Sequence, residues 1–199
     1  MSIDGDALMT QEASSSVPKA DPAARRRAPL VFVLEFVGLL LAFQLLFELW
    51  IKSSDWFAWY LRENAALGAL ILRGLGAPVH AIDNVIESEG YSLAILPGCD
   101  GLQPLAIFLI GVVAYPARAR RKLSVMVTGT LLLLTLNLMR ILSLYYIGVD
   151  WPGAFVTAHE EVWPVGFGVV AFVLWLAWAQ RVSNSIASSA PPVRTTEHA

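Results

Sequence analysis

Four long apolar segments dominate the 199-residue chain. They cover residues 29–50, 101–117, 123–148 and 162–179. A helix needs roughly 17–25 mostly apolar residues to cross a bilayer, and each segment reaches that length, with 101–117 at the short end. Over the whole chain 56% of the residues are hydrophobic and 15% are charged, which is too apolar for an ordinary soluble domain. The sequence therefore predicts an all-α integral membrane protein with about four transmembrane helices.

Basic residues beside three of these segments predict their orientation. Residues 25–27 are three arginines, residues 118–122 contain three arginines and a lysine, and Arg181 follows the last segment. Lysine and arginine are enriched in cytoplasmic loops. All three clusters can lie in the cytoplasm only if the chain crosses the membrane four times and both termini are inside.

Residues 55–78 are less apolar, because Asp55, Arg62, Glu63 and Arg73 interrupt them. We expect an amphipathic helix lying at the outer membrane interface, with its aromatic side chains at headgroup depth. The alternative is a partly re-entrant helix. If the segment spanned the membrane, the later basic cluster would lie outside, against the charge rule.

Residues 79–86 and 91–96 flank the sequence ESEG and predict a short β-hairpin outside the membrane. Residues 1–28 and 183–199 are polar and have no apolar periodicity, so we expect two disordered cytoplasmic tails. A membrane-embedded domain would then cover residues 29–182.

The cysteine and histidine content limits the chemistry of the chain. One cysteine excludes an internal disulfide, a CxxC redox pair and a cysteine-rich metal site. Three scattered histidines do not have metal-ligand spacing, so we expect no metal and no cofactor. A net charge of −2 gives no sign of a nucleic-acid surface.

Three polar residues are predicted to meet at the outer membrane surface. Cys99 lies at the outer end of the second apolar segment. Arg140 lies 18 residues after Lys122, or roughly 27 Å along a helix, in a hydrocarbon core of about 30 Å. His159 falls in the short outer loop before the last segment. The topology alone therefore brings Cys99, Arg140 and His159 to one side.

This combination indicates nucleophilic chemistry. A thiolate is the reactive form of cysteine and needs a lowered pKa, which a cation such as Arg140 and a helix N-terminus both favour. The guanidinium could also stabilise an oxyanion, and His159 suits a general base. Asp100, a candidate helix N-cap, opposes the thiolate, but we expect Arg140 and the helix end to outweigh it.

Each residue also has a structural interpretation. Cys99 could be an inert small hydrophobe, and Arg140 could pair with Glu48 or extend towards outer headgroups. Asn137 lies one turn before Arg140, where it could orient the arginine or make an interhelical hydrogen bond.

The outer histidines are not distinguished by chemistry alone. His80 in the predicted hairpin could act as a base equally well as His159. Its structural interpretation is a solvated hairpin residue. Glu160 and Glu161 could orient His159 or cap the last helix near its N-terminus.

Three motifs, taken in order, resemble the exosortase/archaeosortase family, and most closely its small H-type members. They are PGCDGLQPLAIF, NLMRILSLYYIG and AHEEVW, and the resemblance covers roughly residues 79–180. Asp100 and Pro104 depart from the residues that the family commonly has at these places. The resemblance implies three catalytic residues and three supporting ones: Cys99, Arg140 and His159, with Asn137, Gly101 and Asp100.

The resemblance further implies a cysteine protease and transpeptidase of the inner membrane, with its site on the periplasmic side. The implied partners are the lipid bilayer and secreted proteins that carry a C-terminal sorting signal. Such a signal consists of a short motif, a transmembrane helix and a basic cluster. Cleavage would form a thioester acyl-enzyme, which passes to an acceptor amine or to water.

Two other classes of protein remain open from the sequence. A non-catalytic membrane scaffold or assembly protein would tolerate the loss of the Cys99 thiol. A transporter would use intramembrane Glu35 and Glu48 and would usually contain an internal repeat, but no repeat is visible in the sequence.

Overall fold

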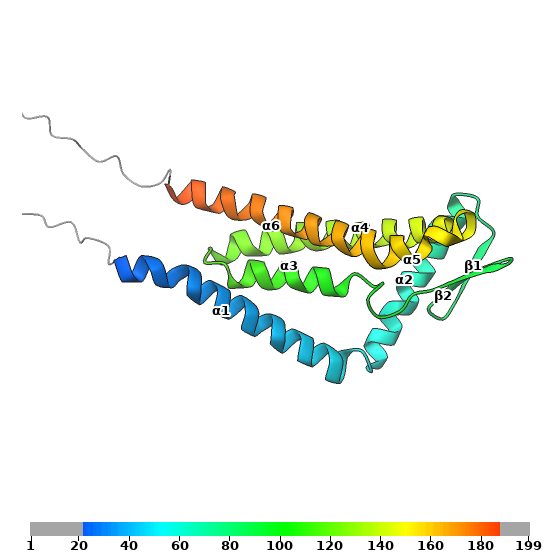
Figure 1. The fold of residues 1–199 in the computed structure, drawn as a ribbon, viewed down its shortest axis with the longest axis horizontal. Helices are drawn as coiled ribbons and strands as arrows, with labels where there is room; N and C mark the ends of the chain where they lie inside the picture. Colours follow the sequence, from blue (N-terminus) through cyan, green and yellow to red (C-terminus); the bar gives the residue numbers. More distant parts are fainter. Residues whose placement is uncertain (1–21, 188–199) are drawn as a thin grey trace, which may run out of the picture.

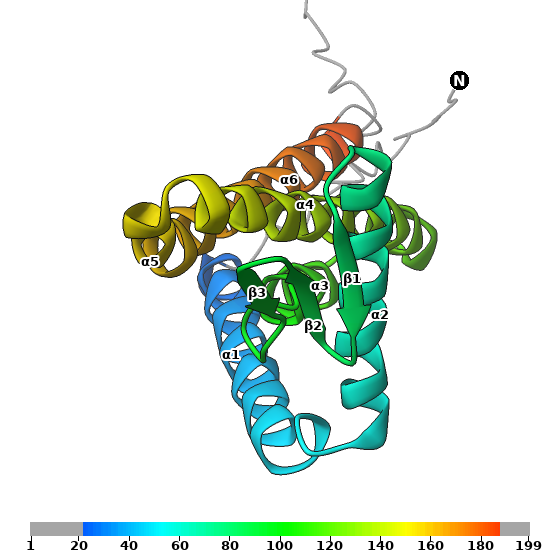
Figure 2. The same ribbon diagram turned by 90° about the vertical axis from the view of Figure 1, so that its right-hand side faces the viewer.

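The structure is a computed structural model that describes residues 22–187. Helices run along the long axis of the molecule (Figure 1). The long-axis helices are α1 (Pro22–Leu46), α3 (Leu102–Ala114), α4 (Ala119–Asp150) and α6 (Trp163–Ala187). A helix and a small sheet cover one end of this bundle (Figures 1 and 2). These elements are α2 (Asp55–Gly74), β1 (Val79–Ile82), β2 (Val85–Ser88) and β3 (Tyr91–Ala94).

Short helical turns join the long elements. The π-helical turn η1 (Phe47–Ile51) extends α1, and α4 is followed by η2 (Pro152–Ala154), α5 (Phe155–Thr157) and the π-helical turn η3 (Ala158–Val162). Single π-helical turns occur often at functional sites.

Three helical segments of the described residues are long and apolar enough to cross a membrane: Leu30–Ile51, Ala119–Asp150 and Pro152–Asn184. The chain is therefore a multi-pass membrane protein, but a count of four spans is not confirmed. Helix α3 has 13 residues, or about 20 Å, against a core of about 30 Å. It ends at Ala114 because Pro116 holds Tyr115 in an extended conformation (φ −72°, ψ 132°).

The start of α1, the end of α6 and the α3–α4 connection lie at one end of the bundle (Figure 1). These are the segments that carry the three basic clusters. The small sheet and α2 lie at the opposite end. This arrangement agrees with the predicted grouping of the clusters on one side.

Helix α2 is amphipathic, as predicted, and is not among the candidate spans of the described residues. Ser54 caps it, because its side-chain oxygen accepts from the Phe57 N–H at 3.2 Å. Its buried face packs on the sheet and α4 through a stripe of apolar side chains: Phe57, Leu61, Ala65, Ala69 and Leu72.

The predicted hairpin is wrong in one respect, because the sheet has three antiparallel strands in the order β1-β2-β3. Residues 79–86, predicted as a single strand, turn back on themselves at Asp83 and Asn84. Asp83 has a positive φ of 50°, a conformation that aspartate tolerates better than most residues. The Asp-Asn pair is thus the turn signal that the sequence interpretation passed over.

The predicted tails also need correction. Helix α1 begins at Pro22 and α6 continues to Ala187, so residues 22–28 and 183–187 are helical. In residues 22–28 alanine and arginine are strong helix formers, and proline is well tolerated in the first turn. The remaining tail residues lie outside the described part of the chain.

Candidate functional site

Cys99 and His159 meet at the end of the bundle that carries the sheet. The Cys99 Sγ lies 2.5 Å from the His159 Nε2, although the two residues are 60 positions apart in the chain. Cys99 lies in the turn between β3 and α3 and is 8% exposed. His159 lies on η3, and its ring stacks on Phe155 with 5.7 Å between ring centroids. The predicted pairing of a thiol with an imidazole is therefore present in the structure.

The turn that carries Cys99 is held by its own backbone and by Asp100. The Cys99 N–H donates to the Leu96 carbonyl at 2.9 Å. The fully buried Asp100 carboxylate accepts from the Gly98 N–H at 3.0 Å and from the Leu102 N–H at 2.6 Å. Asp100 was predicted as the N-cap of α3, but that position is Gly101, in a left-handed conformation with φ 76°. The Asp100 side chain, one residue before Gly101, accepts the N–H of Leu102, which is the first residue of α3.

Arg140 links the cysteine turn to the histidine turn. Its Nη1 donates to the Gly98 carbonyl at 3.1 Å, and its Nη2 donates to the His159 carbonyl at 3.3 Å. The residue is 4% exposed, and its guanidinium carbon lies 6.0 Å from the centroid of the Phe167 ring. Its Nε is buried and has no hydrogen-bond partner among the described residues. One planar guanidinium thus holds two backbone segments and keeps a spare donor.

The alternative pairing of Arg140 with Glu48 is wrong. Glu48 instead pairs with Lys52, four residues along, and both side chains are exposed. Glu35, the other acid of the transporter hypothesis, also lies exposed on α1. Neither acid lines a described cavity.

Asn137 makes the interhelical hydrogen bond that was one of its two interpretations. Its Nδ2 donates to the Asn64 Oδ1 at 3.3 Å, and the Asn64 Nδ2 donates to the Tyr60 carbonyl at 2.9 Å. The Tyr60 hydroxyl then donates to the Asp100 carbonyl at 2.7 Å. A methyl group at Gly101 would lie 2.8 Å from the Asn137 Cγ, so this glycine allows the close approach.

The sequence interpretation missed Tyr60 and Asn64. A signal was available, because the two residues are one helical turn apart and share a face. Both are partly buried in α2, a helix expected only to lie on the membrane. The hydrogen bonds of Tyr60 and Asn64 to Asp100 and Asn137 form only because α2 packs against α4. Helical periodicity does not specify that packing.

Burial raises the pKa of the Cys99 thiol, the opposite of the expected direction. The positive charge of Arg140 lowers this pKa and, as expected, has a larger effect than the negative charge of Asp100, which raises it. Burial has the largest effect, so the net direction is upward. Burial also raises the pKa of the Asp100 carboxyl, against the opposing effect of its backbone N–H donors. Burial therefore favours the protonated thiol, and the His159 Nε2 lies beside it.

The second outer histidine is remote from this chemistry. The His80 Nε2 lies 3.5 Å from the Glu87 Oε2 on the neighbouring strand, and its side chain is 61% exposed. The interpretation of His80 as a solvated hairpin residue is confirmed. Glu160 and Glu161 are exposed, and within residues 22–187 neither has a hydrogen bond to His159. The first helical turn of η3 includes both.

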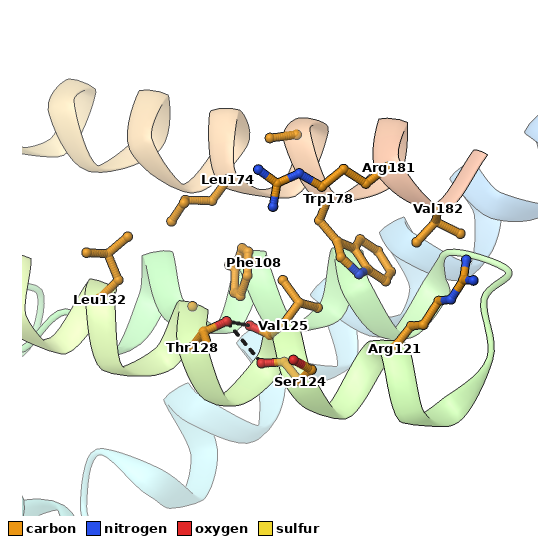
Figure 3. Close-up of a pocket in the computed structure, with 12 residues that line it drawn as sticks. Phe108, Arg121, Ser124, Val125, Thr128, Leu132, Leu174, Trp178, Arg181 and Val182 are labelled. Carbon is orange, nitrogen blue, oxygen red and sulfur yellow. Dashed lines mark hydrogen bonds between the residues drawn. The ribbon is translucent and has the colours of Figure 1, made fainter. Parts of the chain in front are cut away.

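A groove of about 560 Å³ opens beside Cys99 and His159. Its volume falls within the range of about 300–1,000 Å³ that is common for ligand pockets. A second hollow of about 490 Å³ lies between α4 and α6, where Figure 3 shows Arg121 and Arg181 near Trp178. None of the three predicted catalytic residues lines that hollow. Within the described residues, no group of three histidine, cysteine or acidic side chains is placed to hold a metal ion.

These features define a multi-pass membrane protein in which helices and a small sheet bring a cysteine, a histidine and an arginine together at one end. The family model described as transmembrane exosortase matches residues 23–181. The chain belongs to this family, as its three motifs indicated. No curated protein and no solved structure matches the chain.

Proposed function

We propose that the protein is a membrane-embedded cysteine protease and transpeptidase, which cleaves the C-terminal sorting signal of secreted proteins. The observation that carries this proposal is the contact between the Cys99 Sγ and the His159 Nε2 at the edge of a groove. A nucleophile and a base within hydrogen-bond reach are the signature of covalent catalysis. Membership of the exosortase family supports the same chemistry.

The reaction begins with a neutral thiol. His159 accepts the thiol proton as the Cys99 sulfur attacks the carbonyl carbon of the scissile peptide bond. The resulting tetrahedral intermediate collapses when the carbon–nitrogen bond breaks, and the leaving amine takes the proton from His159. The retained fragment is then a thioester on Cys99. An acceptor amine or water attacks this thioester through the same histidine, and the free thiol is restored.

Arg140 acts on this reaction in two ways. Its positive charge lowers the pKa of the Cys99 thiol against the effect of burial, so it favours the thiolate as the proton leaves. Its two hydrogen bonds hold the backbone of the turns that carry Cys99 and His159. The Arg140 Nε–H has no hydrogen-bond partner among the described residues, and we propose that it stabilises the oxyanion once the substrate is bound.

The basic clusters orient the molecule. With these clusters in the cytoplasm, the site faces the outside of the inner membrane, which is the periplasm. A substrate whose transmembrane helix ends in its own basic cluster would adopt the same orientation. Its sorting motif would then lie outside, at the level of Cys99.

The test follows the size of a secreted protein from the native host that carries an apolar C-terminal span and a basic cluster. Wild-type enzyme should trim this precursor, and Cys99→Ala should abolish trimming because the nucleophile is lost. His159→Ala should slow trimming about 10²- to 10⁴-fold, the usual contribution of a general base. Arg140→Lys should also fail to restore full activity, because an ammonium cannot reproduce the planar two-carbonyl contact.

The matched control is His80→Ala, which removes an exposed histidine of the same chemical type. It should process the precursor at the wild-type rate, and all variants should be present in the membrane in equal amounts. Normal trimming by Cys99→Ala would refute the proposal and favour the scaffold alternative.

A further inference from the structure

Strand β3 lies at an edge of the three-stranded sheet. It pairs with β2 on one side, and the other side carries no strand in the described structure. A free edge presents unpaired backbone N–H and C=O groups, to which another extended chain can bind.

The register identifies which backbone groups face the free edge. The Ile95 N–H donates to the Asn84 carbonyl at 2.8 Å, in line with the β2–β3 pairing. In an antiparallel ladder every second residue bonds to the partner strand and the residues between point away. Leu93 therefore bonds to β2, whereas the backbone groups of Ser92 and Ala94 point to the free edge. The side chains of Ser92 and Ala94 are also exposed.

This free edge forms one wall of the catalytic groove. The groove is lined by the whole of β3 and then by Leu96, Pro97 and Cys99, and His159 also lines it beside Cys99. The chain therefore passes from unpaired strand backbone to the nucleophile along a single cavity. Four strand residues span about 13 Å, which is enough to align a short peptide motif.

We propose that the substrate binds as an additional β-strand along the free edge of β3, with its backbone bonded to Ser92 and Ala94. This inference rests on the function proposed above and specifies how its substrate is held. The bound segment is an extended polypeptide on the N-terminal side of the scissile bond. Backbone hydrogen bonds would supply affinity, and alternate side chains of the motif would enter the groove.

The topology sets the direction of the added strand. Strand β3 runs towards the bundle, since Cys99 and then α3 follow it. A substrate with a C-terminal membrane helix also runs from the outside towards the membrane. The added strand therefore lies parallel to β3, and its scissile bond reaches Cys99 after the chain has passed Ala94.

The opposite edge of the sheet does not offer the same site. Strand β1 is also an edge strand, but none of its residues lines the groove beside Cys99. Ala81 on β1 lies opposite Ile86 on β2. The backbone groups of Ile86 bond to Leu93 on β3, so by the same alternation the backbone groups of Ala81 point away from β2. This residue provides a matched control.

Proline substitution tests the proposal, because proline removes an N–H and is tolerated on an edge strand. Ser92→Pro and Ala94→Pro should each slow trimming of the native-host precursor about two- to tenfold, as expected for the loss of one backbone hydrogen bond. Ala81→Pro should leave the rate unchanged. Alkylation of Cys99 by iodoacetamide should match wild type in all three variants, which verifies that the site is intact.

The outcomes separate this inference from the proposed function. Wild-type trimming with equal rates for Ser92→Pro, Ala94→Pro and Ala81→Pro would overturn strand addition and leave the protease assignment in place. A precursor that wild type itself does not trim would overturn the proposed function and this inference with it.

Disulfide mapping provides a second measurement that does not depend on turnover. In a Cys99→Ala, Ser92→Cys enzyme, single cysteines are placed in turn at successive positions before the substrate's membrane span. Strand addition predicts cross-links at every second position, because strand side chains alternate. Cross-links at a three- to four-residue period, or none at all, would overturn the proposal.

Discussion

Arg140 shows how much of the site depends on one side chain. A buried arginine is costly unless its donors are satisfied, and two of them bond to the carbonyls of Gly98 and His159. These carbonyls belong to the two turns that carry Cys99 and His159. The arginine therefore contributes both to the charge of the site and to its geometry.

The ionisation of Cys99 gives the first prediction. Burial raises its pKa, so the rate of alkylation by iodoacetamide should increase with pH and reach half its maximum above the value of about 8.5 for a free cysteine. Arg140→Gln should move this midpoint higher, because the arginine opposes the effect of burial. Mass spectrometry of the solubilised protein can measure the reaction, since Cys99 is the only cysteine.

A cysteine blocked at both ends, N-acetylcysteine N-methylamide, in the same buffers is the reference for that titration. A Cys99 midpoint below the reference would contradict the prediction and would indicate a resting thiolate paired with the imidazolium of His159.

Two glycines beside Cys99 give the second prediction. Both have a positive φ, 95° at Gly98 and 76° at Gly101, so alanine at either position should cost about 1–2 kcal/mol. Gly98 has open space around it, whereas a methyl group at Gly101 would lie 2.8 Å from the Asn137 Cγ. Gly101→Ala should therefore cost about 1–3 kcal/mol more than Gly98→Ala. Thermal unfolding in detergent would show this difference, and equal losses would contradict it.

At the scale of elements, the contact between α4 and β3 fixes the relative position of two elements that line the groove. The Tyr91 ring meets the Tyr145 ring edge to face, with 5.9 Å between centroids. Its hydroxyl lies against Gly148, where an added methyl carbon would come within 1.9 Å of the oxygen. The strand can approach the helix this closely only because residue 148 has no side chain.

Gly148→Ala should therefore be destabilising and should displace β3 from α4, because the Tyr91 ring that it would overlap is packed edge to face on Tyr145. Gly166→Ala in α6 is the matched control, since nothing lies within 4 Å of its added methyl group. In a helix interior that change should be neutral or should stabilise by roughly 0.5–1 kcal/mol. The melting temperatures of the two variants should move in opposite directions or differ clearly; equal temperatures would refute the assignment of this contact.

At the scale of the whole molecule, the topology depends on whether α3 crosses the membrane. The helix is too short to span the hydrocarbon core by itself. The extended residues after it would have to complete the crossing. Irregular backbone at that depth is tolerated where protein covers it, and Tyr115 is indeed partly buried.

A labelling experiment checks this crossing. In a Cys99→Ser background, a cysteine at the exposed Glu89 of the β2–β3 turn should react with a membrane-impermeant maleimide in spheroplasts. A cysteine at the exposed Ala119, where α4 begins, should react only after the membrane is opened. Labelling of both positions from the same side would show that α3 does not cross and would refute the four-span topology.

Features that follow from local sequence pattern could be predicted without a structure. Hydropathy over windows of about 20 residues located the long spans, because the thickness of the hydrocarbon core sets the length of apolar sequence that a crossing helix needs. The helical rise placed Arg140 at the depth of Cys99, since distance along a helix is a simple multiple of residue number. The three motifs indicated the family. These inferences needed no knowledge of how the helices pack.

Features that depend on contacts between distant segments could be read only from the tertiary structure. The direction of the Cys99 pKa follows from burial, which no single segment specifies. The partners of Arg140 and Asn137 were likewise open among several alternatives, because side chains at equal depth can face different helices. Strand β3 can lie beside α4 at the groove because α4 has a glycine, Gly148, where the Tyr91 hydroxyl packs. Packing selects one arrangement from those that the sequence pattern allows, because it depends on shape complementarity between distant segments.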